Sequence, residues 1–318
     1  MMGSKHGQSW RPRGRWTQQL LVIVGARRET GCVPELPEVT ALAADLRRRL
    51  SGRVVDRLVV MSFAALKTFD PPVDAIRGLT VGGVIKHGKF LDIKIGDLHL
   101  IIHLARAGWI RWREAAPTGS GRPGKGPIAA RLVLDDGSGF DVTEAGTKKS
   151  LAIWLVRDPV DVPGIARLGP DPLAEDFTVE VFRQILKDAG RSQIKGLLRN
   201  QSTIAGIGNA YSDEILHVAR MSPFKPAAMS EDESAALYEA ILTTLKAAIA
   251  RADGLAASEL KHEKKTNLRV HARAGEACPV CGDVIRQVKF ADSTLEYCAT
   301  CQTGGKPLAD RVLSRLLK

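Results

Sequence analysis

The spacing of apolar residues near position 40 predicts a helix. Between residues 38 and 50, apolar side chains recur every three or four positions, and polar side chains fill most of the positions between them. This spacing is typical of an amphipathic α-helix with one buried face. Three arginines at 47–49 and then Gly52 are usual signals for the end of a helix, so the helix is predicted to stop there.

The segments that follow have the alternating pattern of strands. Residues 91–95 and 98–102 alternate apolar and polar side chains on either side of a Gly-Asp turn, which is the pattern of a β-hairpin. A second pair of runs flanks Asp136 and Gly137, a dipeptide that favours tight hairpin turns. Residues 34–157 are therefore predicted to form a domain in which a helix leads into an antiparallel sandwich or barrel. We interpret it as an antiparallel β-sandwich with flanking helices, within an α+β fold.

The second half of the chain has a helical pattern. Residues 158–176 contain four of the chain's 16 prolines and are predicted to be a linker between domains. Residues 230–233 have the Ser-x-x-Glu form of a capping box, and apolar residues follow them at helical spacing. Residues 177–260 are therefore predicted to be a helical domain.

Two glycines lie in a double turn in front of one of these predicted helices. Gly206 and Gly208 allow backbone N–H groups to approach an anion, and a helix begins near Asn209 with its positive end at the same place. The pattern favours a phosphate-binding site. The alternative is that the glycines only make the turn.

Four cysteines near the C-terminal end form two Cys-x-x-Cys pairs separated by sixteen residues. They are Cys278, Cys281, Cys298 and Cys301. This spacing predicts a tetrahedral site for one zinc ion, and four thiolates fill the ligand shell, so the ion would be structural. Redox dithiols or disulfides are the alternatives, which low cysteine use and the lack of a credible export signal disfavour. Residues 261–318 are predicted to be a zinc-finger domain with a tail.

The charge of the chain points to a polyanionic partner. The formal net charge is +11 and the pI is near 9.6. Residues 1–33 hold six lysines and arginines against one glutamate, so part of the excess lies in this leader. No apolar run approaches the roughly 18 residues of a membrane span, and cysteine use indicates a reducing, intracellular setting.

The dipeptide Pro34-Glu35 opens the predicted sandwich and offers a specific chemistry. If Pro34 were the first residue, its nitrogen would be a free amine that could attack an electrophilic carbon, with the neighbouring Glu35 as proton donor. The alternative is a proline-rich start of a helix, with Pro37 in the first turn. Residues 1–33 are predicted to be non-native or disordered: translation would start at Val33, and methionine removal would expose Pro34. An authentic basic leader is the alternative.

Motifs along nearly the whole of residues 34–301 resemble the formamidopyrimidine-DNA glycosylase/endonuclease VIII family of base-excision repair enzymes. The matching motifs are Pro34-Glu35-Leu36-Pro37-Glu38, Gly88-Lys89-Phe90-Leu91, His103-Leu104, Leu168-Gly169-Pro170-Asp171-Pro172-Leu173, Gly206-Ile207-Gly208-Asn209-Ala210-Tyr211 and Gly275-Glu276 before the zinc cysteines. The resemblance implies a DNA clamp in which an N-terminal sandwich brings the catalytic amine. A helix–two-turn–helix domain and a zinc hairpin would grip the damaged strand.

The resemblance also implies roles for individual residues. Pro34 matches the nucleophile that attacks the sugar, and Glu35 matches the acid that protonates the ring oxygen and assists departure of the base. Glu38 is similar to a supporting carboxylate. Lys89 and Asn209 match residues that bind phosphate beside the lesion. The damaged base would have to leave the duplex to meet Pro34.

Some positions depart from the family pattern. Arg106 stands where the family usually has a wedge that fills the gap of the flipped base, and a surface arginine is the alternative. Lys148 and Lys149 occupy the second intercalation loop without an aromatic residue. Ser293 replaces the phosphate-gripping arginine of the zinc hairpin, and Lys289 could compensate for it.

Three functions remain open from the sequence. The first is a DNA glycosylase with abasic-site lyase activity, which acts as a monomer on damaged double-stranded DNA in the cytoplasm, at the nucleoid. The second is a binding protein of the same fold that recognises damage without cleavage, and the third is a zinc-ribbon RNA-binding protein. Residues 255–268 leave little room for a long lesion-capping loop, which favours the endonuclease VIII branch and oxidised pyrimidines as substrates.

Overall fold

The computed structural model describes residues 33–115, 127–145, 149–290 and 293–309. Its first element is α1 (Leu36–Leu50), which confirms the predicted helix and starts two residues earlier. Glu35 caps α1 in a capping box with Glu38, and arginines 47–49 lie in the last turn, where cations complement the helix dipole. The apolar face of α1 packs against the strands that follow, in the largest apolar core.

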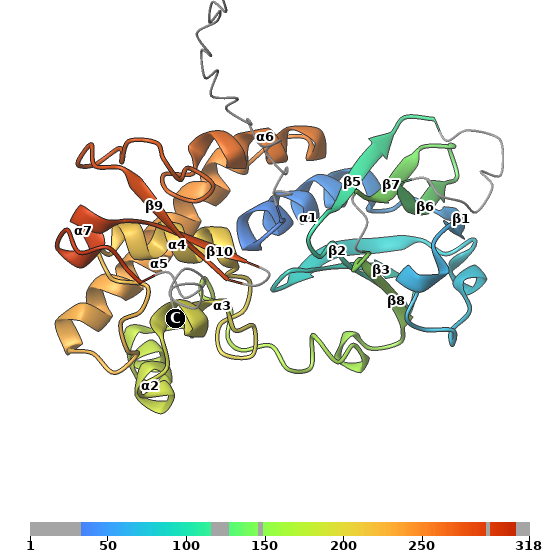
Figure 1. Ribbon diagram of the computed structural model, residues 1–318. Helices are drawn as coiled ribbons and strands as arrows, with labels where there is room; N and C mark the ends of the chain where they lie inside the picture. Colours follow the sequence, from blue (N-terminus) through green and yellow to red (C-terminus); the bar gives the residue numbers. More distant parts are fainter. Residues whose placement is uncertain (1–32, 116–126, 146–148, 291–292, 310–318) are drawn as a thin grey trace, which may run out of the picture. The chain divides into compact units, whose positions relative to one another are not determined.

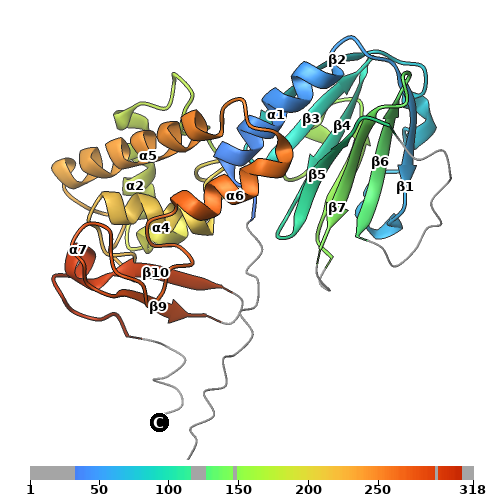
Figure 2. The same ribbon diagram turned by 90° about the horizontal axis from the view of Figure 1, so that it is seen from above.

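The strands of the first half form two four-stranded antiparallel sheets (Figures 1 and 2). One sheet has the order β1 (Val55–Val60), β6 (Ile128–Leu134), β7 (Gly139–Glu144) and β5 (Gly108–Arg113). The other has the order β2 (Val81–His87), β3 (Phe90–Ile95), β4 (Leu98–His103) and β8 (Ala152–Val156). Short 3-10 helices are η1 (Phe63–Ala65), η2 (Val73–Ile76) and η3 (Pro159–Asp161). Both predicted hairpins are present, as β3–β4 and β6–β7.

The second half is helical, as its pattern predicts. The helices are α2 (Val179–Ala189), α3 (Ile194–Arg199), α4 (Asn209–Val218), α5 (Glu231–Ala252) and α6 (Ala257–Asn267). Ser230 and Glu233 form the predicted capping box of α5. Helices α2 to α5 share a second apolar core, separate from that of the sandwich.

Helix α6 packs against the sandwich core and also contacts α1 and α5. Ala257 and Leu260 belong to the sandwich core, and the indole Nε1 of Trp109 on β5 donates a hydrogen bond of 2.8 Å to the carbonyl of Ala257. The predicted boundary between residues 260 and 261 falls inside this helix. Most of residues 255–268, which were predicted to leave little room for a long lesion-capping loop, form this helix.

The predicted linker is tied down along its length. Val162 and Ile165 pack against Phe90 and Ile101 of the second sheet. Lys86 on β2 pairs with Asp171. Apolar packing and an ion pair, as well as the prolines, therefore hold this segment against the second sheet.

The last part of the described chain is the hairpin β9 (Ile285–Lys289) and β10 (Thr294–Cys298), followed by α7 (Ala299–Thr303) (Figure 1). No helix among the residues described is long and apolar enough to cross a membrane.

One buried charge cluster lies inside the first sheet. Asp141 on β7 is fully buried, and it binds Arg131 on β6 at 2.6 Å and Arg113 on β5 at 2.8 Å. Burial by itself would raise the pKa of Asp141, but the two guanidinium groups outweigh it and hold the pKa below its usual range. Asp141 is therefore a carboxylate at neutral pH, and it supports three neighbouring strands.

Replacing Asp141 by alanine is expected to destabilise the sandwich by about 3–5 kcal/mol, because Arg131 would remain buried without its partner. Urea unfolding followed by tryptophan fluorescence measures this, with Asp70→Ala in an exposed ion pair as the control, for which little change is expected. Since the folded pKa is depressed, the difference should persist at neutral pH and shrink as the pH falls below about 4. Equal midpoints for both variants at neutral pH would contradict this role.

Candidate active site and zinc centre

The carboxylate of Glu35 is held at the N-terminus of α4. It accepts hydrogen bonds from the backbone N–H groups of Gly208 at 2.6 Å, Ala210 at 2.9 Å and Tyr211 at 3.3 Å. These are N–H groups that the helix itself cannot satisfy, and the helix dipole favours an anion there. The predicted anion-binding turn thus binds an anion of this chain, and the side chain after Pro34 is fixed in direction.

Two glycines make this approach possible. A Cβ atom at Gly208 would lie 2.5 Å from the carboxyl carbon of Glu35, and one at Gly206 would lie 2.5 Å from a methyl group of Leu36. Gly206 also has a φ of +85°, which favours glycine. The N–H of Leu36 donates to the carbonyl of Gly206 at 3.0 Å. The double turn therefore fits directly around the start of α1.

Glu38 lies about one helical turn beyond Glu35, and its carboxylate accepts three hydrogen bonds. Its carboxylate accepts from the N–H of Glu35 at 2.8 Å, from the hydroxyl of Tyr211 at 2.7 Å and from Nζ of Lys264 at 2.8 Å. Burial raises the pKa of Glu38, and the charge of Lys264 only partly opposes this. Burial, together with the same carboxylate, raises the pKa of Tyr211 well above its usual value. Tyr211 therefore stays a hydrogen-bond donor.

Lys264, on α6, is the site residue that the sequence did not reveal. Its side chain is 1% exposed, and besides Glu38 its Nζ lies 2.9 Å from the carbonyl oxygen of Val33 and 3.7 Å from Oε1 of Glu35. It also lies 4.6 Å from the ring centre of Tyr211. The one signal in the sequence is its spacing: residues 257, 260 and 264 form the buried face of the helix.

Lys89 lies in the turn between β2 and β3, after Gly88, whose φ is +53°. Burial lowers the pKa of Lys89, and the carboxylate of Glu35 opposes that change while the ammonium of Lys264 adds to it. For Glu35, burial by itself would raise the pKa, but Lys264, Lys89 and the N–H of Ala210 hold it below its usual range. Lys264 and Lys89 thus both act on the carboxylate next to Pro34, and Glu35 is ionised at neutral pH.

Helix α4 also binds the zinc hairpin. The side-chain amide of Asn209 donates to the carbonyl of Thr294 on the hairpin at 2.8 Å. His271 Nδ1 lies 2.8 Å from Asp213 on α4 and 3.0 Å from Glu296 on β10. Burial would lower the pKa of His271, but the two carboxylates raise it to about 9, so it is a cation at neutral pH.

Lys195 completes this second cluster. Its Nζ lies 2.6 Å from Asp213 and 2.8 Å from the hydroxyl of Ser212. His271 likewise holds the pKa of Glu296 at about 2, against the opposing effect of burial. The oxygens and nitrogen of Asp213, Glu296 and His271 are close enough to hold a metal ion, but the protonated imidazole already balances these carboxylates.

The remaining predicted DNA contacts lie at the surface. Arg106 is exposed on the turn between β4 and β5, and Lys289 is exposed at the end of β9. Lys149 is exposed and donates to the carbonyl of Glu144 at 2.6 Å. Lys148 lies outside the described residues. Ser293 closes the tip of the hairpin, where its carbonyl accepts from the N–H of Phe290 at 2.9 Å. These positions do not test the DNA contacts, which stay predictions.

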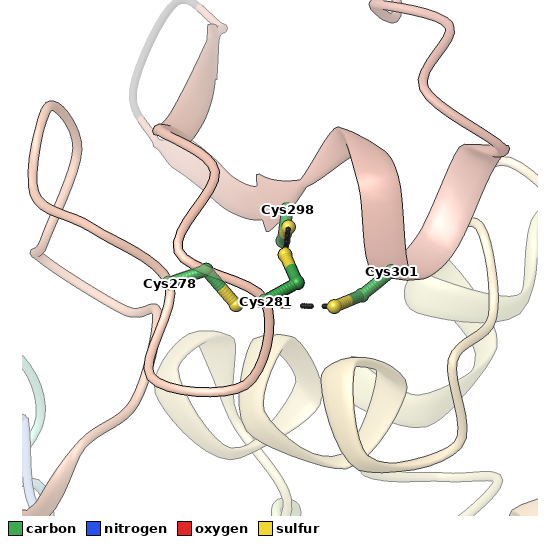
Figure 3. A group of neighbouring side chains, drawn as sticks. All are labelled: Cys278, Cys281, Cys298 and Cys301. Carbon is green, nitrogen blue, oxygen red and sulfur yellow. Dashed lines mark hydrogen bonds between the residues drawn. The ribbon is translucent and has the colours of Figure 1, made fainter.

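The four predicted zinc ligands converge, as Figure 3 shows. The sulfur atoms of Cys281 and Cys298 lie 3.4 Å apart, and those of Cys278 and Cys301 lie 3.9 Å apart. A tetrahedron of Zn–S bonds of about 2.3 Å has edges of about 3.8 Å, whereas a disulfide is about 2 Å long. The four thiols therefore suit one structural zinc ion. His217 on α4 lies 3.3 Å from the sulfur of Cys278, so the centre also contacts the helical part.

Three family models match the chain in order. The formamidopyrimidine-DNA glycosylase N-terminal domain matches residues 33–146, and the H2TH domain of the same glycosylase matches residues 168–259. A zinc finger found in FPG and IleRS matches residues 275–304. The predicted resemblance, the sandwich, the helix–two-turn–helix domain and the zinc finger are thus confirmed.

Individual relatives agree with these matches. A formamidopyrimidine-DNA glycosylase of Heliobacterium modesticaldum is 33% identical over 281 residues, which cover 85% of this chain and 100% of the relative. An uncharacterized formamidopyrimidine-DNA glycosylase-like protein of Mycobacterium tuberculosis is 53% identical over 152 residues, which cover 48% of this chain and 94% of that protein.

Solved structures have the same fold. The MutM (Fpg) protein of Thermus thermophilus superposes with a TM-score of 0.72 at 30% identity, over 86% of this chain and 100% of that one. The Lactococcus lactis Fpg bound non-covalently to DNA with an AP site has a TM-score of 0.73 at 26% identity, over 85% of this chain and 99% of that one. With a relative matched over its full length and three family models in the expected order, the chain belongs to the formamidopyrimidine-DNA glycosylase family.

Proposed function

We propose that this protein is a DNA glycosylase of base excision repair that removes oxidised bases and then cleaves the strand at the abasic site. The observation that carries the proposal is the position of Glu35. The N-terminus of α4 fixes its carboxylate beside Pro34, with Lys264 and Lys89 close enough to set its charge. The Lactococcus lactis relative binds DNA that contains an AP site, which is the intermediate of such a reaction.

The reaction needs a free amine at Pro34. Within a peptide bond to Val33, the ring nitrogen is an amide and has no available lone pair. In a chain that begins at Pro34, the nitrogen is a secondary amine that titrates near pH 8, so a useful fraction is uncharged at neutral pH. The proposal therefore includes release of the segment before Pro34.

The ionised state of Glu35 defines its part in the proton transfers. The nitrogen of Pro34 forms a bond to C1′ of the flipped nucleoside, and the bond from C1′ to the base breaks. The base leaves with the electron pair and takes up a proton from water. The new ammonium must then lose its proton while O4′ gains one and the C1′–O4′ bond opens to leave an iminium. A carboxylate can accept the first proton and deliver it to O4′, so Glu35 fits as a shuttle. Elimination from the iminium then releases the 3′ phosphate.

The other predicted residues are proposed to hold the DNA. Lys89 and Asn209 would bind phosphates near the lesion, and Arg106, Lys149 and Lys289 offer cations at the surface. The zinc ion would hold β9 and β10 in the position at which Thr294 accepts the hydrogen bond from Asn209. We propose that the protein acts as a monomer, since one chain supplies all of these groups, and that its substrate is nucleoid DNA in the cytoplasm.

A second function is favoured by a specific observation. Ser293, which has no positive charge, forms the tip of the hairpin where the family has an arginine. This fits a protein that binds damaged DNA without cleaving it. The two functions differ in one measurable step, the covalent bond from Pro34.

Borohydride reduction tests that step. The chain that begins at Pro34 is expected to form a covalent complex with duplex DNA containing an abasic site, while the full chain, whose Pro34 nitrogen is acylated, is expected to form none. Denaturing electrophoresis and peptide mapping of the adduct measure both. A panel of oxidised purines and pyrimidines then identifies the preferred base.

Replacing Glu35 by glutamine tests its role as proton carrier separately from the role of Pro34 as nucleophile. Glu35→Gln in the chain that begins at Pro34 should slow base excision by about 10²–10⁴-fold, because the glutamine cannot carry the proton.

Two outcomes of the trapping experiment would show that Pro34 is not the nucleophile. One is an adduct of equal yield from the full chain, and the other is no adduct from the chain that begins at Pro34. The latter result would favour the binding function.

Loss of zinc is expected to abolish tight DNA binding. Cys281→Ser leaves three thiolates, so the ion should be released and the hairpin should lose its fixed position. Metal analysis should give one zinc per chain for the parent protein and a large deficit for the variant. Affinity for abasic-site DNA should fall at least about tenfold. Val280→Ala, between two ligands at an exposed position, is the control. Unchanged affinity in the zinc-free variant would exclude the hairpin from the interface.

A further inference from the structure

Lys264 binds the peptide group whose nitrogen would become the catalytic amine. Its Nζ is 2.9 Å from the carbonyl oxygen of Val33. Two covalent bonds join that oxygen to the ring nitrogen of Pro34, so the ammonium is no farther than about 5.5 Å from this nitrogen. The side chain is almost fully buried, so water screens its charge little.

We propose that the positive charge of Lys264 keeps the amine of Pro34 unprotonated near neutral pH. Lys264 would thus be a positioning residue that sets the pH range in which Pro34 can attack. This inference rests on the proposed function, since it concerns the same nucleophile.

The charges around Pro34 decide the sign of the effect. Glu35 and Glu38, before and within α1, favour the protonated amine, because an opposite charge stabilises a cation. Lys264 on α6 and Lys89 in the β2–β3 turn disfavour it. Tyr211 on α4 is uncharged, since its pKa is raised. Lys264 is the cation that directly contacts Glu38 and lies 3.7 Å from Glu35, so it cancels much of the field of both carboxylates.

Removal of Val33 would take away a hydrogen-bond acceptor of Lys264. In the extended chain, Val33 accepts a hydrogen bond from Lys264. Once Pro34 is the first residue, this acceptor is gone and the ammonium faces the amine. An uncharged amine can accept a hydrogen bond from an ammonium group, while a protonated amine cannot. Hydrogen bonding and charge repulsion therefore both favour the uncharged form.

Lys264 is also held where this effect requires it. Glu38, in the first turn of α1, and the ring of Tyr211 on α4 both contact the ammonium, and the hydroxyl of Tyr211 also binds Glu38. A lysine on a flexible surface loop would not maintain such a field. The arrangement thus supplies a fixed positive charge beside the nucleophile.

The pH profile of trapping tests the proposal on the chain that begins at Pro34. Single-turnover borohydride trapping on abasic-site DNA is measured from about pH 5.5 to about pH 10. For Lys264→Met, the midpoint of the profile, which is the pH at which the trapping rate reaches half its maximum, should rise by about one unit or more. The rate at neutral pH should then fall about tenfold and recover at alkaline pH. Lys264→Arg, which keeps the charge, should keep the parent midpoint.

A double-mutant cycle distinguishes an effect of charge on the amine from a defect in folding. Lys264→Met leaves Glu38 buried without its partner, so Lys264→Met/Glu38→Gln removes both charges together. The double variant should have a midpoint between those of the parent and Lys264→Met, and Glu38→Gln alone should have a lower midpoint than the parent. Affinity for DNA with a non-reactive abasic analogue reports folding.

Two results would overturn the role of Lys264. One is a rate that falls by the same factor at every pH in Lys264→Met, which indicates a structural defect. The other is an unchanged profile. Failure of the proposed function itself appears differently, because the parent chain would then give no adduct at any pH.

Discussion

The contact on which the rest of this site depends is the one between Glu35 and the first turn of α4. Three backbone N–H groups bind one carboxylate, and the two glycines of the double turn provide the space for it. The contact joins residues that are more than 170 positions apart in the chain. It directs the side chain beside Pro34, and it satisfies donors that a helix leaves open. A turn that resembles a phosphate-binding loop is thus used to hold an internal carboxylate.

This contact also explains the charge balance of the site. A carboxylate that is buried this deeply needs compensation, and the helix N-terminus supplies only part of it. Lys264 and Lys89 supply the rest from two other elements of the fold. Lys264 also reaches the peptide bond before Pro34, through the carbonyl oxygen of Val33. In the proposed function, a cation that keeps Glu35 ionised would therefore also influence the proton on an amine at Pro34.

The sequence predicted those features that arise from local patterns. The capping box of α5, the hairpins around β3–β4 and β6–β7, and the four zinc cysteines all follow from residues close together in the chain. Lys264 could not be found in this way, because its partner Glu38 is 226 positions away. Helical spacing shows that this lysine is on a buried face, but it does not show which carboxylate faces it. The same holds for His271, whose partners lie on α4 and β10.

Helix α4 connects the two centres of the protein. Its first turn binds Glu35, while Asn209 and Asp213 on the same helix bind the zinc hairpin through Thr294 and His271. Since a helix of ten residues is stiff, a shift of the hairpin is transmitted to the N–H groups that hold the carboxylate. Zinc therefore supports the catalytic end of the molecule as well as the proposed grip on DNA. The zinc site, although far along the sequence from Pro34, thus reaches Glu35 through α4.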